Sequence, residues 1–142
     1  MKLSLGIGEG AQDHPSGNCF ALESNADFLQ GVSFNKGCYI GQELTARIYH
    51  SGVIRKRLVP IEFIKCFEHQ TGQFKENLVI ISEKGEKLGK LRSHLGLKGL
   101  GLIYVDKLLK NNNQLIGKID SNDNQIKVKA IKPFWWPKEM LF

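Results

Sequence analysis

The sequence predicts a β-rich α+β fold, in which a Gly-rich connector and two short helices precede a six-stranded antiparallel β-barrel. Three observations support this prediction. Chain-breaking residues crowd the first 20 positions, helix signals follow between residues 24 and 52, and short apolar runs then alternate with turn residues. The length of 142 residues suits one compact unit with a modest core and a short appendage. We therefore divide the chain into residues 1–51 and residues 52–142.

The first segment is predicted to be a loop-rich connector followed by one short helix. Four glycines and one proline occur within the first 20 residues, which disfavours a long helix or strand there. Ser24 or Asn25 then provides an N-cap, the helix continues to Gln30, and Gly31 ends it. We expect this helix to lie just before a glycine-flanked loop that contains Cys38.

A glycine-flanked loop from Lys36 to Gly41 is predicted next, followed by a second helix. The residues from Gln42 to Tyr49 include Glu, Leu, Ala and Arg, which are good helix formers, and Ser51 and Gly52 close the helix. Glu43 lies at the start of this helix, where the helix dipole stabilises a negative charge. Arg47 lies four residues later, at the spacing of an intrahelical ion pair.

The second segment is predicted to be the barrel. Its candidate strands are residues 53–63, 78–82, 87–92, 99–105, 114–119 and 126–131. Turn residues separate them at 83–86 and at 121–124, and 111–113 is an Asn-rich loop. In the last strand Ile126, Val128 and Ala130 alternate with two lysines, which is typical of an antiparallel strand with one solvent-facing side.

The charge distribution, the hydropathy and the start of the chain limit the partners and the location that we expect for this protein. Residues 1–50 hold three Lys/Arg and five Asp/Glu, whereas residues 51–142 hold 17 Lys/Arg and nine Asp/Glu. The basic excess of the second part fits either a solvated face or an acidic or nucleic-acid partner. No apolar run approaches the roughly 20 residues of a membrane span, and we expect no membrane association. The start shows neither a signal peptide nor an Arg-rich presequence, as in a cytosolic protein or one whose beginning is missing.

Cys38 is the strongest candidate for a residue with a chemical role. Cys19, Cys38 and Cys66 lack the spacing of a zinc site, a self-contained cluster or a disulfide framework. Cys38 lies between Gly37 and Tyr39, where the backbone can turn and expose a thiol, and a nearby lysine favours the thiolate. Two readings stay open: a buried inert cysteine and a functional thiol.

A functional Cys38 has two possible uses. Iron-sulfur clusters take about four protein ligands, so Cys38 contributes only one ligand, to a site shared with another protein. The competing use is nucleophilic catalysis with His50, which lies twelve residues later.

The basic run at residues 55–57 and the pair of tryptophans each have a structural and a functional interpretation. The charges of residues 55–57 point to both faces of a strand, which favours a solvated site over a partner contact. The pair Trp135 and Trp136 favours a hydrophobic clamp that closes the barrel over a stacking platform for bases.

The run Lys36-Gly-Cys-Tyr-Ile-Gly-Gln-Glu43 resembles the K-G-C-[FY]-x-G-Q-E signature of the YgfZ-like proteins. Ala46-Arg47 and Gly52 extend this resemblance. Further support comes from residues 22–25, 55–57 and 135–137, which look most like the eukaryotic mitochondrial branch of that family. The signature residues matched here are Lys36, Gly37, Cys38, Tyr39, Gly41, Gln42 and Glu43, with Arg47 as a secondary residue.

The resemblance implies a fold related to the aminomethyltransferase of the glycine cleavage system and a role in maturing mitochondrial [4Fe-4S] proteins with an A-type carrier. It implies tetrahydrofolate binding in full-length relatives, whose long N-terminal region supplies most of the folate pocket; residues 1–51 match the end of that folate-binding domain. It implies that the protein is located in the mitochondrial matrix, and that it acts as an assembly factor more than as a catalyst. The alternatives are a folate-dependent one-carbon transferase and an RNA-modification accessory protein.

Overall fold

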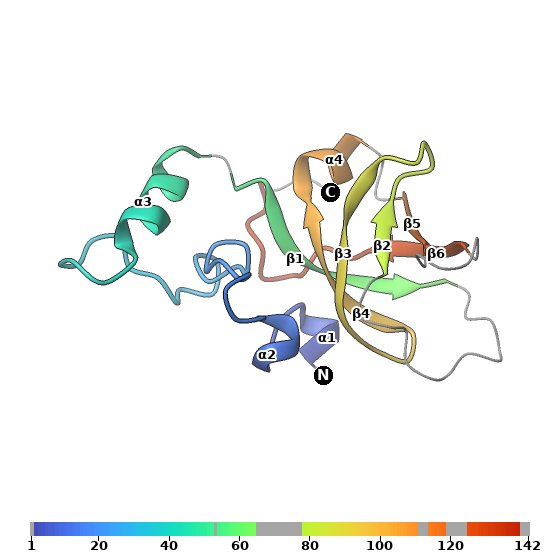
Figure 1. The fold of residues 1–142 in the computed structure, drawn as a ribbon, viewed down its shortest axis with the longest axis horizontal. Helices are drawn as coiled ribbons and strands as arrows, with labels where there is room; N and C mark the ends of the chain where they lie inside the picture. Colours follow the sequence, from blue (N-terminus) through green and yellow to red (C-terminus); the bar gives the residue numbers. More distant parts are fainter. Residues whose placement is uncertain (1, 53, 65–77, 111–113, 119–124, 140–142) are drawn as a thin grey trace.

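A computed structural model describes residues 2–52, 54–64, 78–110, 114–118 and 125–139. Figure 1 shows an antiparallel barrel with the connector and α3 on one side of it. The helices are α1 (Lys2–Leu5), α2 (Gly10–Asp13), α3 (Gln42–His50) and α4 (Val105–Lys110). The strands are β1 (Lys56–Phe63), β2 (Val79–Ile81), β3 (Lys87–Leu95), β4 (Lys98–Tyr104), β5 (Gln114–Lys118) and β6 (Gln125–Ala130). The β-rich α+β prediction is confirmed.

The strands close on themselves in the order β1-β4-β3-β2-β5-β6, and neighbours pair antiparallel. Side chains from alternate positions fill the barrel, because successive residues of a strand face opposite sides. The predicted alternation of the last strand is confirmed: Ile126, Val128 and Ala130 are buried, and Lys127 and Lys129 are exposed.

Strand β1 is buried on both sides, which explains its almost continuous burial. Val59 and Ile61 belong to the barrel core. Leu58 points the other way and packs with Leu3 of α1 and Leu100 of β4 in a second, smaller cluster. The connector therefore covers part of the outer surface of the barrel, and two short helices form within residues predicted to be loop.

The turn between β2 and β3 has the predicted location. Gly85 takes a φ of 81°, a left-handed conformation that favours glycine, and the amide of Glu86 donates to Ser82 Oγ at 3.1 Å. The Glu86 carboxylate also lies 2.6 Å from Lys107 Nζ of α4, and this hydrogen bond raises the pKa of Lys107. Helix α4 itself was not expected from the sequence. The turns predicted at 111–113 and 121–124 lie outside the described residues.

The helix predicted from Ser24 or Asn25 to Gln30 is wrong; residues 21–30 form successive turns. Asn25 has a φ of 64° and Gln30 a φ of 57°, both incompatible with a right-handed helix. The Asn25 side chain is fully buried and donates to the Leu58 carbonyl at 2.8 Å. A contact with β1 thus overrides the local helix signals.

The tryptophan pair closes the barrel as predicted. Trp136 is 3% exposed, belongs to the barrel core and meets Phe28 edge-to-face at a centroid distance of 5.5 Å. Trp135 Nε1 donates to the Leu5 carbonyl at 2.6 Å, which joins the end of the chain to α1. The hydrophobic clamp is confirmed, and both rings are held by protein contacts rather than offered for base stacking.

Candidate cluster-handling site

Cys38 lies in an exposed loop that leads directly into α3. The inert buried reading is therefore wrong, because the thiol is accessible to a partner. Gly37 beside it has open space around it, and Gly41 ends the loop as the N-cap of α3. Gly41 takes a φ of 85°, so the chain reverses into the helix at a position where a side chain is strained.

Three contacts shape the loop around Cys38. The amide of Tyr39 donates to Gln42 Oε1 at 3.1 Å, so the first side chain of α3 reaches back to hold the loop. The Lys36 ammonium lies 4.8 Å from the centre of the Tyr39 ring, a cation-π contact. Phe34 stacks on Tyr49 with centroids 3.7 Å apart. The signature residues thus order the loop, while the thiol stays at its surface.

Helix α3 and its loop expose apolar side chains. None of the nine residues of α3 is buried, and Figure 1 shows the helix standing away from the barrel. Ile40 is fully exposed two residues after Cys38, and Leu44 and Tyr49 of α3 are 40% and 43% exposed. Exposed apolar side chains on one loop and helix are typical of a protein contact surface.

Two predicted interactions are absent among the described residues. Glu43 lies in the first turn of α3 and Arg47 in the last, but no ion pair within 4 Å joins them. Their charges stay available to a partner. In the same part of the chain, no hydrogen bond joins Cys38 to His50, whose ring instead meets Tyr49 at 5.6 Å. The geometry does not supply Cys38 with the histidine that nucleophilic catalysis requires.

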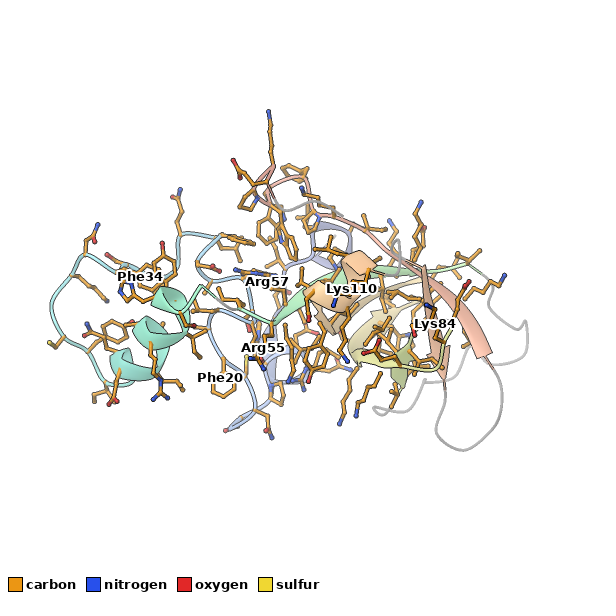
Figure 2. The ribbon with its side chains drawn as sticks, turned by 90° about the horizontal axis from the view of Figure 1, so that it is seen from above. Phe20, Phe34, Arg55, Arg57, Lys84 and Lys110 are labelled. Carbon is orange, nitrogen blue, oxygen red and sulfur yellow. The ribbon has the colours of Figure 1, made fainter. Side chains whose placement is uncertain are left out.

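Arg57 was expected to be solvated, and this prediction is wrong. Arg57 is 3% exposed, its guanidinium donates to both carboxylate oxygens of Asp27 at 2.9 and 2.8 Å, and it lies 3.7 Å from the centre of the Phe28 ring. Nη1 also donates to the Leu22 carbonyl. Figure 2 shows Arg57 between the α3 side of the molecule and the barrel. Arg57 therefore fastens the connector that carries the Cys38 loop.

The strand pattern contained a signal for this role. Arg57 shares its face of β1 with the inward-facing residues Val59 and Ile61, since side chains alternate along a strand. Its two neighbours fit the earlier prediction better: Arg55 is exposed, and Lys56 is half-buried over the Tyr104 ring at 5.0 Å.

A second exposed thiol lies in a polar cluster of the connector. Cys19 Sγ is 3.3 Å from His14 Nδ1 and 3.0 Å from Ser24 Oγ, and these two atoms are 3.2 Å apart. Sequence reasoning missed this cluster because its members are separated by loop residues. Cys66 lies outside the described residues.

Metal coordination by this chain alone finds no support in the described ranges. No group of three or more His, Cys, Asp or Glu side chains within them is arranged to hold a metal ion. The use of Cys38 as one ligand of a shared site stays a prediction. None of the helices among these residues is long and apolar enough to cross a membrane.

The effect of Gly41 on the site is testable. Gly41→Ala is expected to destabilise the start of α3 by about 1–2 kcal/mol, because alanine must adopt the left-handed conformation. Helical circular dichroism during thermal unfolding measures this loss. Gly37→Ala is the matched control, since Gly37 does not have a positive φ and a Cβ there meets nothing within 4 Å. Equal effects of both changes would contradict the role of Gly41.

The structure shows a β-barrel preceded by a cysteine-bearing loop and a helix, and a comparison with known families gives the class to which the barrel belongs. The family model "CAF17, C-terminal beta-barrel domain" matches residues 55–138, more than half of the chain. The chain belongs to this family. The resemblance to YgfZ-like proteins is thereby confirmed.

The three relatives described next are all named IBA57 or IBA57 homolog. The chain is 42% identical over 132 residues to "Iron-sulfur cluster assembly factor IBA57, mitochondrial" of Homo sapiens. The aligned residues make up 93% of the chain and 35% of the human protein. It is 34% identical over 132 residues to the IBA57 homolog of Dictyostelium discoideum, with 90% and 32% covered. Over 62 residues it is 53% identical to the homolog of Mycosarcoma maydis, with 44% and 15% covered. The chain spans about a third of the length of the human and Dictyostelium relatives.

Proposed function

We propose that this protein assists iron-sulfur cluster assembly in mitochondria, by presenting Cys38 as one ligand of a cluster that a second protein also holds. The observation that carries the proposal is the exposed Cys38 on a loop ordered by its own signature residues. The names of the relatives, which are mitochondrial iron-sulfur cluster assembly factors, support the pathway and the compartment.

The partner we propose is an A-type iron-sulfur carrier, and maturation of [4Fe-4S] proteins is the outcome. A single exposed cysteine suits transient sharing of a cluster, because the remaining ligands of about four come from the carrier. Ile40 and Leu44 supply the apolar contacts near the thiol, and Glu43 and Arg47, which form no ion pair among the described residues, supply polar contacts at the rim. Assembly assistance is thus favoured over catalysis by this chain.

We propose that the full-length form of the family binds tetrahydrofolate, as the resemblance to the YgfZ-like proteins implies. The closed strand order supports a barrel of the aminomethyltransferase C-terminal type, with six strands as the expected count. One-carbon transfer is the second candidate function, and the names of the relatives favour cluster assembly over it.

Anaerobic mixing of the protein with an A-type carrier that holds a [2Fe-2S] cluster tests the proposal. We expect a complex that elutes ahead of either protein and carries the visible absorption of the cluster. Absence of any complex contradicts a shared site. A complex that forms equally well with the cluster-free carrier contradicts the ligand role, while leaving a plain protein contact.

The apolar contact has its own test. Ile40→Glu is expected to weaken the complex by about tenfold or more, because a charge replaces a fully exposed apolar side chain that the partner buries. Titration of the carrier, followed by light scattering or calorimetry, measures the change. Leu95→Glu is the matched control: Leu95 is 79% exposed, at the end of β3. If both variants bind like the wild type, Ile40 lies outside the interface.

A further inference from the structure

A groove lies between the connector and the outer surface of the barrel, on strands β1, β3 and β4. Its volume is about 400 Å³, and its walls include Phe20 and Glu23 of the connector and Lys56, Lys90, Arg92 and Tyr104 of the strands. A volume of this size is in the range of small-molecule sites, which run from about 300 to 1,000 Å³. The Cys38 loop does not line it.

Strand register brings two of the three cations of the groove together. Lys56 on β1 is opposite Tyr104 on β4, and Lys90 on β3 is opposite Leu102 on β4. Because Tyr104 and Leu102 are two positions apart on β4, the side chains of Lys56 and Lys90 share one face of the sheet. The register shifts at Arg92, which has no pairing partner on β4, but its side chain also lines the groove.

The charge of the groove is not neutralised by neighbouring carboxylates. Among the described residues, no carboxylate within 4 Å pairs with Lys56, Lys90 or Arg92. Glu23 is the acidic residue among the lining side chains. Arg92 is held in place, because its Nη2 donates to the Asn18 carbonyl at 3.2 Å, while Lys90 is exposed. The groove therefore presents one hydrogen-bonded cation, Arg92, and one exposed cation, Lys90, to solvent.

Aromatic side chains give the groove an apolar part. Phe20 is 45% exposed on the connector, and the Tyr104 ring lies on the barrel with the Lys56 ammonium 5.0 Å from its centre. Figure 2 shows Phe20 at the connector side of the barrel, with Lys84 far from it at the opposite end. A planar apolar group fits beside Phe20, while an anionic group meets the lysines and Arg92.

We propose that this groove binds a small organic anion, with a carboxylate or phosphate group attached to an apolar or aromatic body. Its volume of about 400 Å³ and its pairing of cations with aromatic rings favour a small ligand over a nucleic acid. Extended nucleic-acid binding uses a longer positive track along several phosphates. The inference is independent of Cys38 and of the cluster.

Amide chemical-shift titration of the full chain tests this site, with phenyl phosphate and inorganic phosphate as probes. We expect saturable shifts at Phe20, Lys90, Arg92 and Tyr104, with phenyl phosphate bound about tenfold more tightly than phosphate. Lys90→Gln is expected to weaken both probes by about fivefold. Phe20→Ser is expected to abolish the preference for phenyl phosphate, while inorganic phosphate binds as before.

Lys84→Gln is the matched control, because it removes one exposed lysine from the β2–β3 turn without touching the groove. It is expected to leave the affinity for both probes unchanged. Equal weakening by Lys84→Gln and Lys90→Gln, or shifts spread over the whole surface without saturation, would overturn the proposal. Displacement of phenyl phosphate by a single-stranded oligonucleotide that binds more tightly would also overturn it, in favour of a nucleic-acid surface.

Discussion

Arg57→Ala is expected to lower the free energy of unfolding by about 3–5 kcal/mol, the largest stability loss we predict for this protein. The side chains of Arg57 and Asp27 are 4% and 9% exposed, so the substitution leaves a carboxylate buried without its partner. It also removes the cation from the face of Phe28 at 3.7 Å. A loss of this size is a large fraction of the stability of a small domain.

Urea unfolding followed by tryptophan fluorescence measures this loss, since Trp136 lies 6.0 Å from the guanidinium. Arg55→Ala is the matched control: Arg55 is exposed two residues earlier and is expected to change stability by less than about 0.5 kcal/mol. Arg57→Lys is expected to recover little, because a lysine cannot form the bidentate pair with Asp27. Similar stabilities of Arg57→Ala and Arg55→Ala would show that the buried pair contributes nothing.

Cys38→Ala is expected to abolish the cluster-bearing complex with the carrier while the fold stays intact. The thiol is exposed and fills no space in the core, so the free energy of unfolding changes by less than about 0.5 kcal/mol. The complex loses its visible absorption because a methyl group cannot ligate iron. Absorption and elution volume after anaerobic mixing measure the first effect, and urea unfolding the second.

Cys19→Ala is the matched control, since Cys19 is the other exposed thiol among the described residues. It is expected to form the cluster-bearing complex as the wild type does. Loss of the complex in both variants would point to general thiol chemistry rather than a ligand at Cys38. Unfolding of Cys38→Ala alone would mean that the loop is part of the core.

The barrel strands and α3 were predictable from the sequence because their signals are local. Alternating burial along residues 126–130 and the helix formers after Gly41 agree with the structure within a residue or two. The turns at residues 21–30 were not predictable, because Asn25 is held by Leu58, 33 positions away. Local propensity cannot register such a partner.

The candidate site also has some features that the sequence indicates and others that only the folded structure determines. The glycines around Cys38 favoured an exposed thiol but left a buried one open, and the structure shows that Cys38 is exposed. The contact of Gln42 with Tyr39 and the stacking of Phe34 on Tyr49 depend on how the loop turns, which residue spacing does not determine. The groove needed both strand register and the path of the connector, so its basic residues looked like an ordinary solvated face.

The Arg57 network also bears on how the protein can be dissected. The barrel begins at β1, but Asn25, Asp27 and Phe28 cover one end of it through Arg57, Leu58 and Trp136. A fragment cut just before β1 would leave an uncovered guanidinium and an open hydrophobic end. The turns at residues 21–30 and the barrel are therefore expected to unfold together, so a substitution at Arg57 would loosen the segment that leads into the Cys38 loop.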